Sequence, residues 1–372
     1  MSSINSGEST TFFEDDEPEE IAIAVMGPTG VGKTSFINLL SGSGLKVGSE
    51  MVSCTSSVQA ANPFDFEDYR ITLIDTPGFD DTTLRDSDVL GMIAAYLSYA
   101  HGHGQTLAGI VYMHRILDNR MGGISSRNFR MFRRLCGDNS LQNVVIVTNM
   151  WGQVDHELGV ARETELATKD IFFKPVLEKG ARLARHDRTL KSARAIIQSL
   201  VGKRPQVLQI QQELANGMDI TETSAGKELN RDLMEQMSRH KEEIRLLMTQ
   251  MEEASKLRDE EARRELSQDR ARHRAEVTRI QLDSRNIVAG YAEAMMKLEQ
   301  RVKESEAAAK IAAKKAEEAK ESNLRFSEEQ KNAQSVSADN AVIEAKMGAA
   351  LPIFGFWGRL ALMLSPFSLS WK

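Results

Sequence analysis

The chain has 372 residues, enough for one sizeable core and a second structural unit. Its formal net charge of -6 at pH 7 is mild, which argues against a protein that binds nucleic acid in general. Cys54 and Cys136 are too few for a disulfide framework and favour a reduced, cytoplasmic compartment. Glycine, aromatic and β-branched residues crowd the first half, whereas Glu, Lys, Ala, Gln, Arg and Met dominate after about residue 226. We therefore expect a globular domain followed by a long helical one.

Residues 1–20 are acidic. Their carboxylates belong to Glu14, Asp15, Asp16, Glu17, Glu19 and Glu20. A stretch so rich in like charge predicts a disordered leader, and it contains no basic, then apolar, secretory signal.

The motif GPTGVGKT occupies residues 27–34, after the apolar run 21–26 and before a segment at 35–40 that we expect to be helical. Strand, glycine-rich loop and helix is the context that makes this motif a phosphate-binding loop rather than a chance turn. Its glycines let successive N–H groups face one point, where they and the helix N-terminus hold phosphate oxygens. Lys33 supplies a positive charge for the β- and γ-phosphates, and Thr34 offers a hydroxyl to Mg²⁺. The expected nucleotide-binding residues here are Gly27, Thr29, Gly30, Val31, Gly32, Lys33, Thr34 and Ser35.

The polar segment 48–60, GSEMVSCTSSVQA, follows in the chain. A switch protein needs a mobile loop here, with a hydroxyl that reaches Mg²⁺ and an N–H that reaches the γ-phosphate. We select Thr55 for this role. Its close competitors are Ser53, Ser56 and Ser57, and a solvated linker without a ligand is the alternative.

The next motif is Asp-Thr-Pro-Gly at residues 75–78, which closes the strand-like run RITLI at 70–74. Asp75 at the strand end is expected to hold Mg²⁺ through a water molecule, and the Gly78 N–H to contact the γ-phosphate. A simple Pro-Gly turn is the alternative, but the pair of motifs favours a nucleotide switch. The expected metal-binding residues are thus Thr34, Thr55 and Asp75.

Strand-like and helix-like segments alternate through the first half. The strand-like runs are 70–74, 109–114 and 143–148, and the helix-like segments are 86–100, 125–136, 161–179 and 190–201. Alternation predicts an α/β domain over residues 21–202, with a mostly parallel sheet and helices on both faces. Asp86 and Ser125 are the expected helix N-caps, and Pro175 is expected to interrupt its helix. In such folds ligands bind beyond the carboxyl ends of the strands, where the motifs fall.

After a linker at 203–226, residues 227–335 are expected to form a coiled coil. The a/d seam consists of Leu233, Met237, His240, Ile244, Leu247, Met251 and Ala254. The pattern blurs at 258–274, resumes, and fades into alanines at 309–319. A helix this long and polar needs a partner helix for its apolar stripe. A single solvated helix held by i,i+4 charge pairs is the alternative.

The last segment, 347–372, is strongly apolar, with Arg359 its only charge before Lys372. Pro352 and Pro366 bracket a core shorter than the roughly 20 residues that span a bilayer. Three interpretations stay open: a short tail anchor, an interfacial segment, and a helix docked on protein. Two of the three imply membrane contact.

The combination GPTGVGKTSFIN, SCTSSVQ and LIDTPGFDD resembles the septin-like branch of P-loop GTPases. It looks most like the avirulence-induced-gene, or immune-associated nucleotide-binding, GTPases and the related chloroplast import receptors. With the coiled coil and the Thr-Asn-Met-Trp sequence at 148–151, it resembles a fungal group of G-domain proteins. The resemblance covers about residues 21–200 and implies a G domain that binds GTP/GDP and Mg²⁺. It also implies dimerisation through the G domain at a membrane surface. We therefore expect a homodimer, formed through the G domain, the coiled coil or both.

The base-binding motif departs from the family pattern. Guanine is usually read by the aspartate of an Asn/Thr-Lys-x-Asp motif, and neither the lysine nor the aspartate is present at 148–151. Asn149 is our candidate for a hydrogen bond to the base, and Trp151 for stacking on it. Asp155 lies further along the chain. His186 and Asp187 are weaker candidates, for which capping of the next helix is the alternative. The choice of GTP over ATP therefore rests on the resemblance.

Phe79 stands where Ras-type enzymes carry a glutamine that orients water. Intrinsic hydrolysis should therefore be slow unless a partner supplies a group, and we assign no catalytic residue. Candidates for such a group are His101, His103, Arg115, Arg120 and Arg127, whose default roles are loop histidine and solvated surface arginine. The resulting hypothesis is a GTP-binding switch that hydrolyses GTP slowly to GDP and phosphate. The alternatives are a coiled-coil scaffold that binds nucleotide without turnover and, disfavoured by the DTPG motif, a small-molecule kinase.

Overall fold

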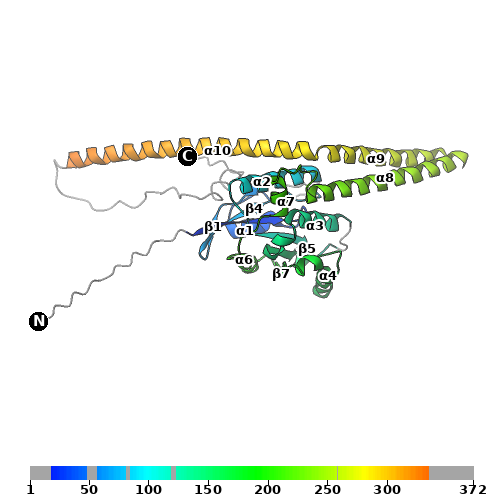
Figure 1. Ribbon diagram of the computed structural model, residues 1–372, viewed down its shortest axis with the longest axis horizontal. Coiled ribbons are helices and arrows are strands. Elements are labelled where there is room, and N and C mark those ends of the chain that lie inside the picture. Colours follow the sequence, from blue (N-terminus) through cyan, green and yellow to red (C-terminus); the bar gives the residue numbers. More distant parts are fainter. Residues whose placement is uncertain (1–17, 48–56, 81–83, 119–122, 258, 335–372) are drawn as a thin grey trace.

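The computed structural model describes residues 18–47, 57–80, 84–118, 123–257 and 259–334 (Figure 1). Most of the acidic leader, Thr55 with Ser53 and Ser56, Arg120 and the apolar segment 347–372 lie outside these residues. Within them, an α/β domain carries a long helical region along one side (Figure 1).

The sheet of the described residues has seven strands. They are β1 (Glu19–Met26), β2 (Gln59–Ala60), β3 (Phe64–Phe66), β4 (Tyr69–Asp75), β5 (Gly109–Arg115), β6 (Val144–Asn149) and β7 (Arg182–Arg185). The order is β2-β4-β1-β5-β6-β7, with β3 also paired to β4. β4, β1, β5, β6 and β7 run parallel, and only β2 and β3 are antiparallel to β4. The predicted mostly parallel sheet is therefore confirmed.

Both faces of the central strands are buried, because successive side chains of a strand point to opposite faces. In β1, Ala22, Ala24 and Met26 join one apolar cluster, while Ile21, Ile23 and Val25 join the other. This two-sided burial explains why the strands read as continuous apolar runs in the sequence.

Helices cover each face of the sheet. Those of the domain are α1 (Lys33–Ser41), α2 (Asp86–Gly102), α3 (Gly123–Cys136), α4 (His156–Thr168), α5 (Lys174–Leu177), α6 (Leu190–Gln198) and α7 (Gln209–Ala215), with 3-10 turns η1 (Asp138–Asn143) and η2 (Trp151–Gln153). Phe36 and Ile37 of α1 and Ile196 of α6 pack on the Ile21 face. Residues of α2, α3, α5 and α7 pack on the opposite face.

Several helix boundaries differ from the prediction. α2 begins at Asp86, but Arg85 is its N-cap. α4 begins at His156, earlier than expected, because the Asp155 carboxylate accepts hydrogen bonds from the N–H groups of Glu157 and Leu158. Pro175 lies in the first turn of α5, where its missing N–H costs nothing, so it starts a helix and does not interrupt one. The short strands β2, β3 and β7 were not predicted.

The helical region consists of α8 (Ser224–Leu257), α9 (Glu260–Arg285) and α10 (Ile287–Gln334). α8 folds back on α9 as an antiparallel hairpin, while α10 continues roughly in line with α9 (Figure 1). The hairpin register places His240 beside His273, with the two Nδ1 atoms 2.9 Å apart. α9 is thus the partner helix for the apolar stripe of α8, and it belongs to the same chain.

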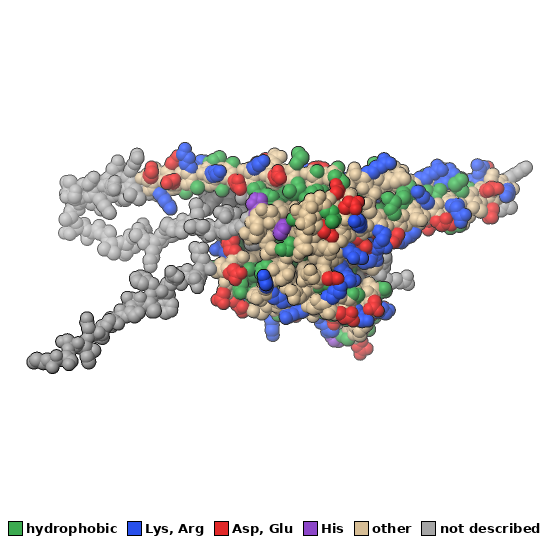
Figure 2. Space-filling model, viewed as in Figure 1, with side chains coloured by type: hydrophobic (Ala, Val, Ile, Leu, Met, Phe, Trp, Pro, Cys, Tyr) green, Lys and Arg blue, Asp and Glu red, His purple; other side chains and the backbone are tan. Residues whose placement is uncertain are grey.

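α10 packs along α2. The two helices approach closely where each has a glycine: a Cβ on Gly91 would lie 3.0 Å from the Tyr291 nitrogen and 3.1 Å from the Gly290 carbonyl carbon. Ile287, Leu298 and Val302 of α10 are buried. Figure 2 shows positive and negative side chains interspersed along the exposed part of the helical region.

Ion pairs join helices of the α/β domain to the hairpin. Arg127 of α3 lies 2.6 Å from Asp86 of α2 and 3.4 Å from Asp232 of α8. The Arg127 side chain is only 14% exposed, so its expected default as a solvated surface arginine is wrong. Arg85 likewise reaches Asp283 of α9 at 3.6 Å.

Among the residues the structure describes, no helix is both long enough and apolar enough to cross a membrane.

Candidate functional site

The GPTGVGKT loop connects the end of β1 to the start of α1. Gly32, with φ at 94°, caps the helix. Gly27 has no room for a side chain, since a Cβ there would lie 2.4 Å from the Met113 carbonyl oxygen on β5. The Lys33 side chain is buried, and its ammonium donates to the carbonyls of Gly27 at 3.0 Å and Pro28 at 2.9 Å. The lysine thus lies across its own loop.

The carboxyl end of β4 brings the second motif to this loop. The Thr34 hydroxyl donates to Asp75 Oδ2 at 2.6 Å, and Asp75 is fully buried. Two predicted metal-binding residues, 41 positions apart, therefore meet. Oxygen donors of this kind suit Mg²⁺, which binds few protein groups and keeps phosphate and water ligands.

Gly78 lies against the phosphate loop. A Cβ on Gly78 would lie 2.5 Å from the Thr29 nitrogen, so only glycine permits the contact. The Thr29 N–H donates to the Phe79 carbonyl at 3.2 Å, and the Thr29 hydroxyl to the Gly78 carbonyl at 3.4 Å. The two motifs are thus joined by backbone contacts.

Residues 57–60, which follow the predicted Thr55 in the chain, lie beside the same site. Gln59 pairs with Asp75 across β2 and β4. Ser57 is half-buried, whereas Thr55 itself lies outside the described residues. Ser35 is exposed on the first turn of α1.

Asn149 joins β6 to the phosphate loop. Its side-chain amide donates to the Val31 carbonyl at 3.0 Å, and its side-chain oxygen accepts from the Met150 N–H at 2.7 Å. The residue is buried, and both of its polar groups are engaged within the chain. Asn149 therefore supports the loop in this structure, and its hydrogen bond to a base stays a prediction.

A side-chain network follows at the ends of β6 and β7. The Trp151 indole N–H donates to the Thr148 carbonyl at 3.2 Å, and the Arg185 guanidinium stacks 4.2 Å above the Trp151 ring. Glu163 of α4 accepts from the Thr148 hydroxyl at 2.9 Å and from Arg185 Nε at 2.8 Å. Sequence reasoning missed Arg185 and Glu163 because neither belongs to a motif of fixed spacing.

The weaker base candidates are occupied elsewhere. The Asp187 carboxylate accepts from the Thr189 N–H at 3.0 Å, and His186 Nδ1 lies 2.8 Å from the Ser192 hydroxyl. Hydrogen bonds from Ser192 and Thr189 hold the pKa of Asp187 well below its ordinary value. These contacts organise the start of α6, as the helix-capping alternative predicts. Asp155 caps α4.

The histidines of the HGHG loop do not form a metal site with other described residues, since no group of three His, Cys, Asp or Glu side chains gathers among them. His103 Nδ1 lies 2.8 Å from the Tyr99 carbonyl, and its ring packs on that of Tyr99. Phe79 is 8% exposed and belongs to the apolar core.

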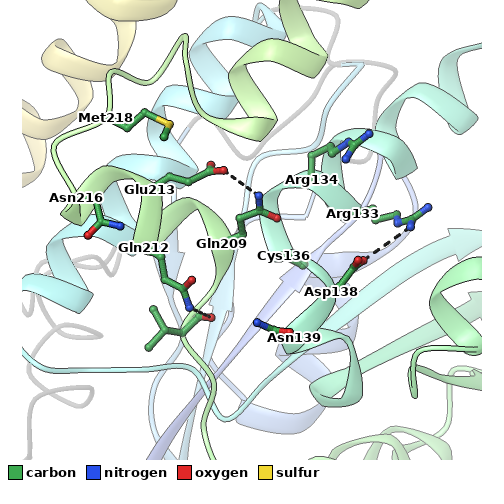
Figure 3. Close-up of a pocket in the computed structure, with 12 residues that line it drawn as sticks. Arg133, Arg134, Cys136, Asp138, Asn139, Gln209, Gln212, Glu213, Asn216 and Met218 are labelled. Atoms are coloured by element: carbon green, nitrogen blue, oxygen red, sulfur yellow. Dashed lines mark hydrogen bonds and ion pairs between the residues drawn. The ribbon is translucent and has the colours of Figure 1, made fainter.

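A cavity of about 400 Å³ lies away from the phosphate loop, between α3, η1 and α7 (Figure 3). Arg133 pairs with Asp138 at its rim, and Gln209 with Glu213. None of the motif residues lines it.

Residues 22–150 match the family model described as 50S ribosome-binding GTPase. No curated protein sequence matches the chain. Among solved structures, Toc33 from Arabidopsis thaliana in complex with Mg²⁺ and GMPPNP is 15% identical, with a TM-score of 0.41 over 50% of this chain and 87% of that chain. Era in complex with MgGDPNP and a segment of 16S ribosomal RNA is 16% identical, with a TM-score of 0.36 over 51% of this chain and 58% of that chain.

The phosphate loop between β1 and α1, the second motif at the end of β4 and the match over residues 22–150 agree with one another. They identify a P-loop GTPase G domain, which is followed here by a long helical region.

Proposed function

We propose that the chain is a GTP-binding switch protein with Mg²⁺-dependent nucleotide binding and slow hydrolysis of GTP. The observation that carries this proposal is the meeting of Thr34 with Asp75, beside a lysine that lies across the phosphate loop. The buried ammonium of Lys33 and the buried carboxylate of Asp75 both lie there, at the carboxyl end of a parallel sheet where ligands bind in such folds.

The roles we propose follow from this geometry. Lys33 exchanges its two carbonyl partners for phosphate oxygens, and the backbone N–H groups of residues 30–34 hold the phosphates. Thr34 and Asp75, with Thr55 from the neighbouring loop, hold Mg²⁺ directly or through water. A bound Mg²⁺ supplies neutralisation of the phosphate charge. The Gly78 N–H contacts the γ-phosphate, and Asn149 supports the phosphate loop through its hydrogen bond to the Val31 carbonyl.

Slow turnover follows from Phe79. In hydrolysis, water attacks the γ-phosphorus, the bond to the bridging oxygen breaks, and GDP and phosphate leave. The buried Phe79 side chain offers no hydrogen bond to that water. We therefore propose that turnover needs a group from a dimer partner or another protein, which is compatible with the G-domain dimerisation that the resemblance implies.

The helical region is proposed to report the nucleotide state and to contribute to a homodimer. α2 begins shortly after the DTPG motif and packs against α10. Loss of the γ-phosphate releases the loops near Gly78 and shifts α2, which moves the helices packed on it. We also propose that segment 347–372 contacts a membrane. Its removal should abolish co-sedimentation with vesicles, and retained binding would contradict that role.

Mass spectrometry of nucleotide retained through native purification tests the central proposal. We expect GTP or GDP, and recovery of ATP or ADP alone would refute the choice of base. Lys33→Ala should abolish binding of labelled GTP, with Lys46→Ala on an exposed position as the matched control. Unchanged affinity in Lys33→Ala would refute the site.

A second candidate function is a scaffold whose G domain binds nucleotide without turnover. The burial of Phe79 favours it. Single-turnover phosphate release at rising protein concentration separates the two functions. A rate that increases with concentration supports a dimer-activated GTPase, whereas no release at any concentration supports the scaffold.

A further inference from the structure

Arg115 at the carboxyl end of β5 lies beside the phosphate loop. A Cβ placed on Gly30 would lie 3.7 Å from Arg115 Nη1, so the guanidinium is within reach of one of the loop glycines. Arg115 is also the pairing partner of Asn149 across β5 and β6. Two neighbouring strand ends thus place a side chain on the same loop, Asn149 at Val31 and Arg115 at Gly30.

The guanidinium is held in this position by its neighbours. Arg115 Nε lies 3.0 Å from Asp118 Oδ1, which leaves Nη1 directed at the loop. The turn that carries Asp118 is fixed by Arg162 of α4, whose Nη1 donates to the carbonyls of Ile116 and Leu117, each at 3.1 Å. The Arg115 side chain is 34% exposed, so it combines restricted movement with access to solvent.

The base-binding motif lacks the cation that usually follows its asparagine. Met150 occupies that position, with a left-handed backbone at φ 66°. Arg115 on the adjacent strand brings a positive charge to the same side of the loop. Guanidinium groups bind phosphate through paired N–H donors, and they keep their charge at every physiological pH.

We propose that Arg115 binds the phosphates of the nucleotide held by its own chain. This inference rests on the proposed nucleotide-binding function. In it, Arg115 Nη1 donates to a phosphate oxygen next to the Gly30 amide, while Asp118 orients the guanidinium. The arginine that looked like a solvated surface residue in the sequence is then a part of the nucleotide site.

The test compares Arg115→Met with Arg133→Met, a partly exposed arginine remote from the phosphate loop. Affinities for GTP, GDP and inorganic triphosphate are measured at low and high salt. We expect Arg115→Met to weaken GTP and triphosphate binding alike, by about tenfold to a hundredfold at low salt and less at high salt. Arg133→Met should bind as the wild type does. Equal affinities in Arg115→Met and the wild type would overturn the proposal, as would a loss of affinity for GTP and GDP without a loss for inorganic triphosphate.

A merely structural role for Arg115 is tested with Asp118→Asn, which removes the same ion pair but keeps the guanidinium. We expect this variant to retain most of the affinity for triphosphate. If it loses as much as Arg115→Met does, Arg115 acts through its ion pair and the proposal fails.

Arg115 could instead act on the nucleotide of a partner subunit. This alternative is tested by mixing the Arg115→Met protein with the Lys33→Ala protein, since the latter keeps Arg115 but has a defective phosphate loop. No rescue of GTP affinity is expected, and rescue would overturn the assignment to the same chain. Failure of the underlying function is distinguishable, because the wild type and Lys33→Ala would then bind nucleotide equally.

Discussion

His114 on β5 makes the stability of the domain depend on pH. Its side chain is 2% exposed, and its ring meets that of Phe173 edge to face at a centroid distance of 5.4 Å. Burial, and next the charge of Arg115, lower the pKa of His114 to about 4. The unfolded chain releases this proton with a pKa of about 6.5. Between these values the unfolded state binds more protons than the folded state, so stability falls as the pH falls.

The size of the effect follows from the two pKa values. At pH 5.5 the folded state loses about 1 kcal/mol of stability relative to neutral pH, and at pH 4.5 about 2–3 kcal/mol. Below pH 4 the loss levels off at about 3 kcal/mol. Most of the change therefore falls between pH 6.5 and 4, and very little of it appears above pH 7.5.

Urea unfolding of wild type and His114→Leu at pH 7.5, 6.5, 5.5 and 4.5 measures this dependence. We expect the difference in unfolding free energy between the two proteins to change by about 1 kcal/mol from pH 7.5 to 5.5, in favour of the variant. His103→Leu, on an exposed position at the end of α2, is the matched control for loss of an imidazole. A His114→Leu protein whose stability depends on pH as the wild type does would refute the reasoning.

Three further substitutions test the packing of the helical region. Gly91→Val should force α2 and α10 apart where their glycines meet and lower the unfolding free energy by about 1–3 kcal/mol. Amide hydrogen exchange should become faster than in the wild type in α10 but not in α1, and unchanged exchange in α10 would contradict the contact. Arg127→Met should remove the cation that pairs with both Asp86 and Asp232, which leaves Asp232 only Arg130 at 3.9 Å. We expect it to destabilise the protein by about 3 kcal/mol in urea unfolding, and an unaltered midpoint would count against the ion pairs. Gly226→Ala should also lower the urea midpoint, because its Cβ would meet the Ile220 carbonyl oxygen at 1.9 Å, and a protein of wild-type stability would show that this turn adjusts freely.

Short-range motifs were predictable because their chemistry lies in contiguous residues. The glycines and Lys33 of the phosphate loop lie within eight consecutive residues, so their spacing in the sequence is enough to predict their place in the loop. Asp75 and Gly78 were predictable for a related reason, since the ends of parallel strands meet at one edge of a sheet. Helix boundaries were harder to predict where a side-chain cap sets the first residue, as Asp155 does for α4.

The helical region shows where sequence reasoning stops. Its seam predicted that α8 needs a partner, but periodicity does not say which helix that partner is. The structure packs α8 against α9, and the glycines on α2 and α10 allow those helices to approach closely. His240, the polar exception in the seam, faces His273 across the hairpin.

The sequence by itself determined an α/β domain with a phosphate loop, a second motif at a strand end and a long helical extension. These features depend on local spacing and on alternation of apolar residues, both of which are written along the chain. Only the tertiary structure decided that Asn149 bonds to the phosphate loop and that Arg115 lies beside it. It also decided that Arg185 stacks on Trp151 and that Arg127 joins α2 to α8. Each of these contacts joins residues of different elements, and it exists because the packing of strands and helices brings distant parts of the chain together.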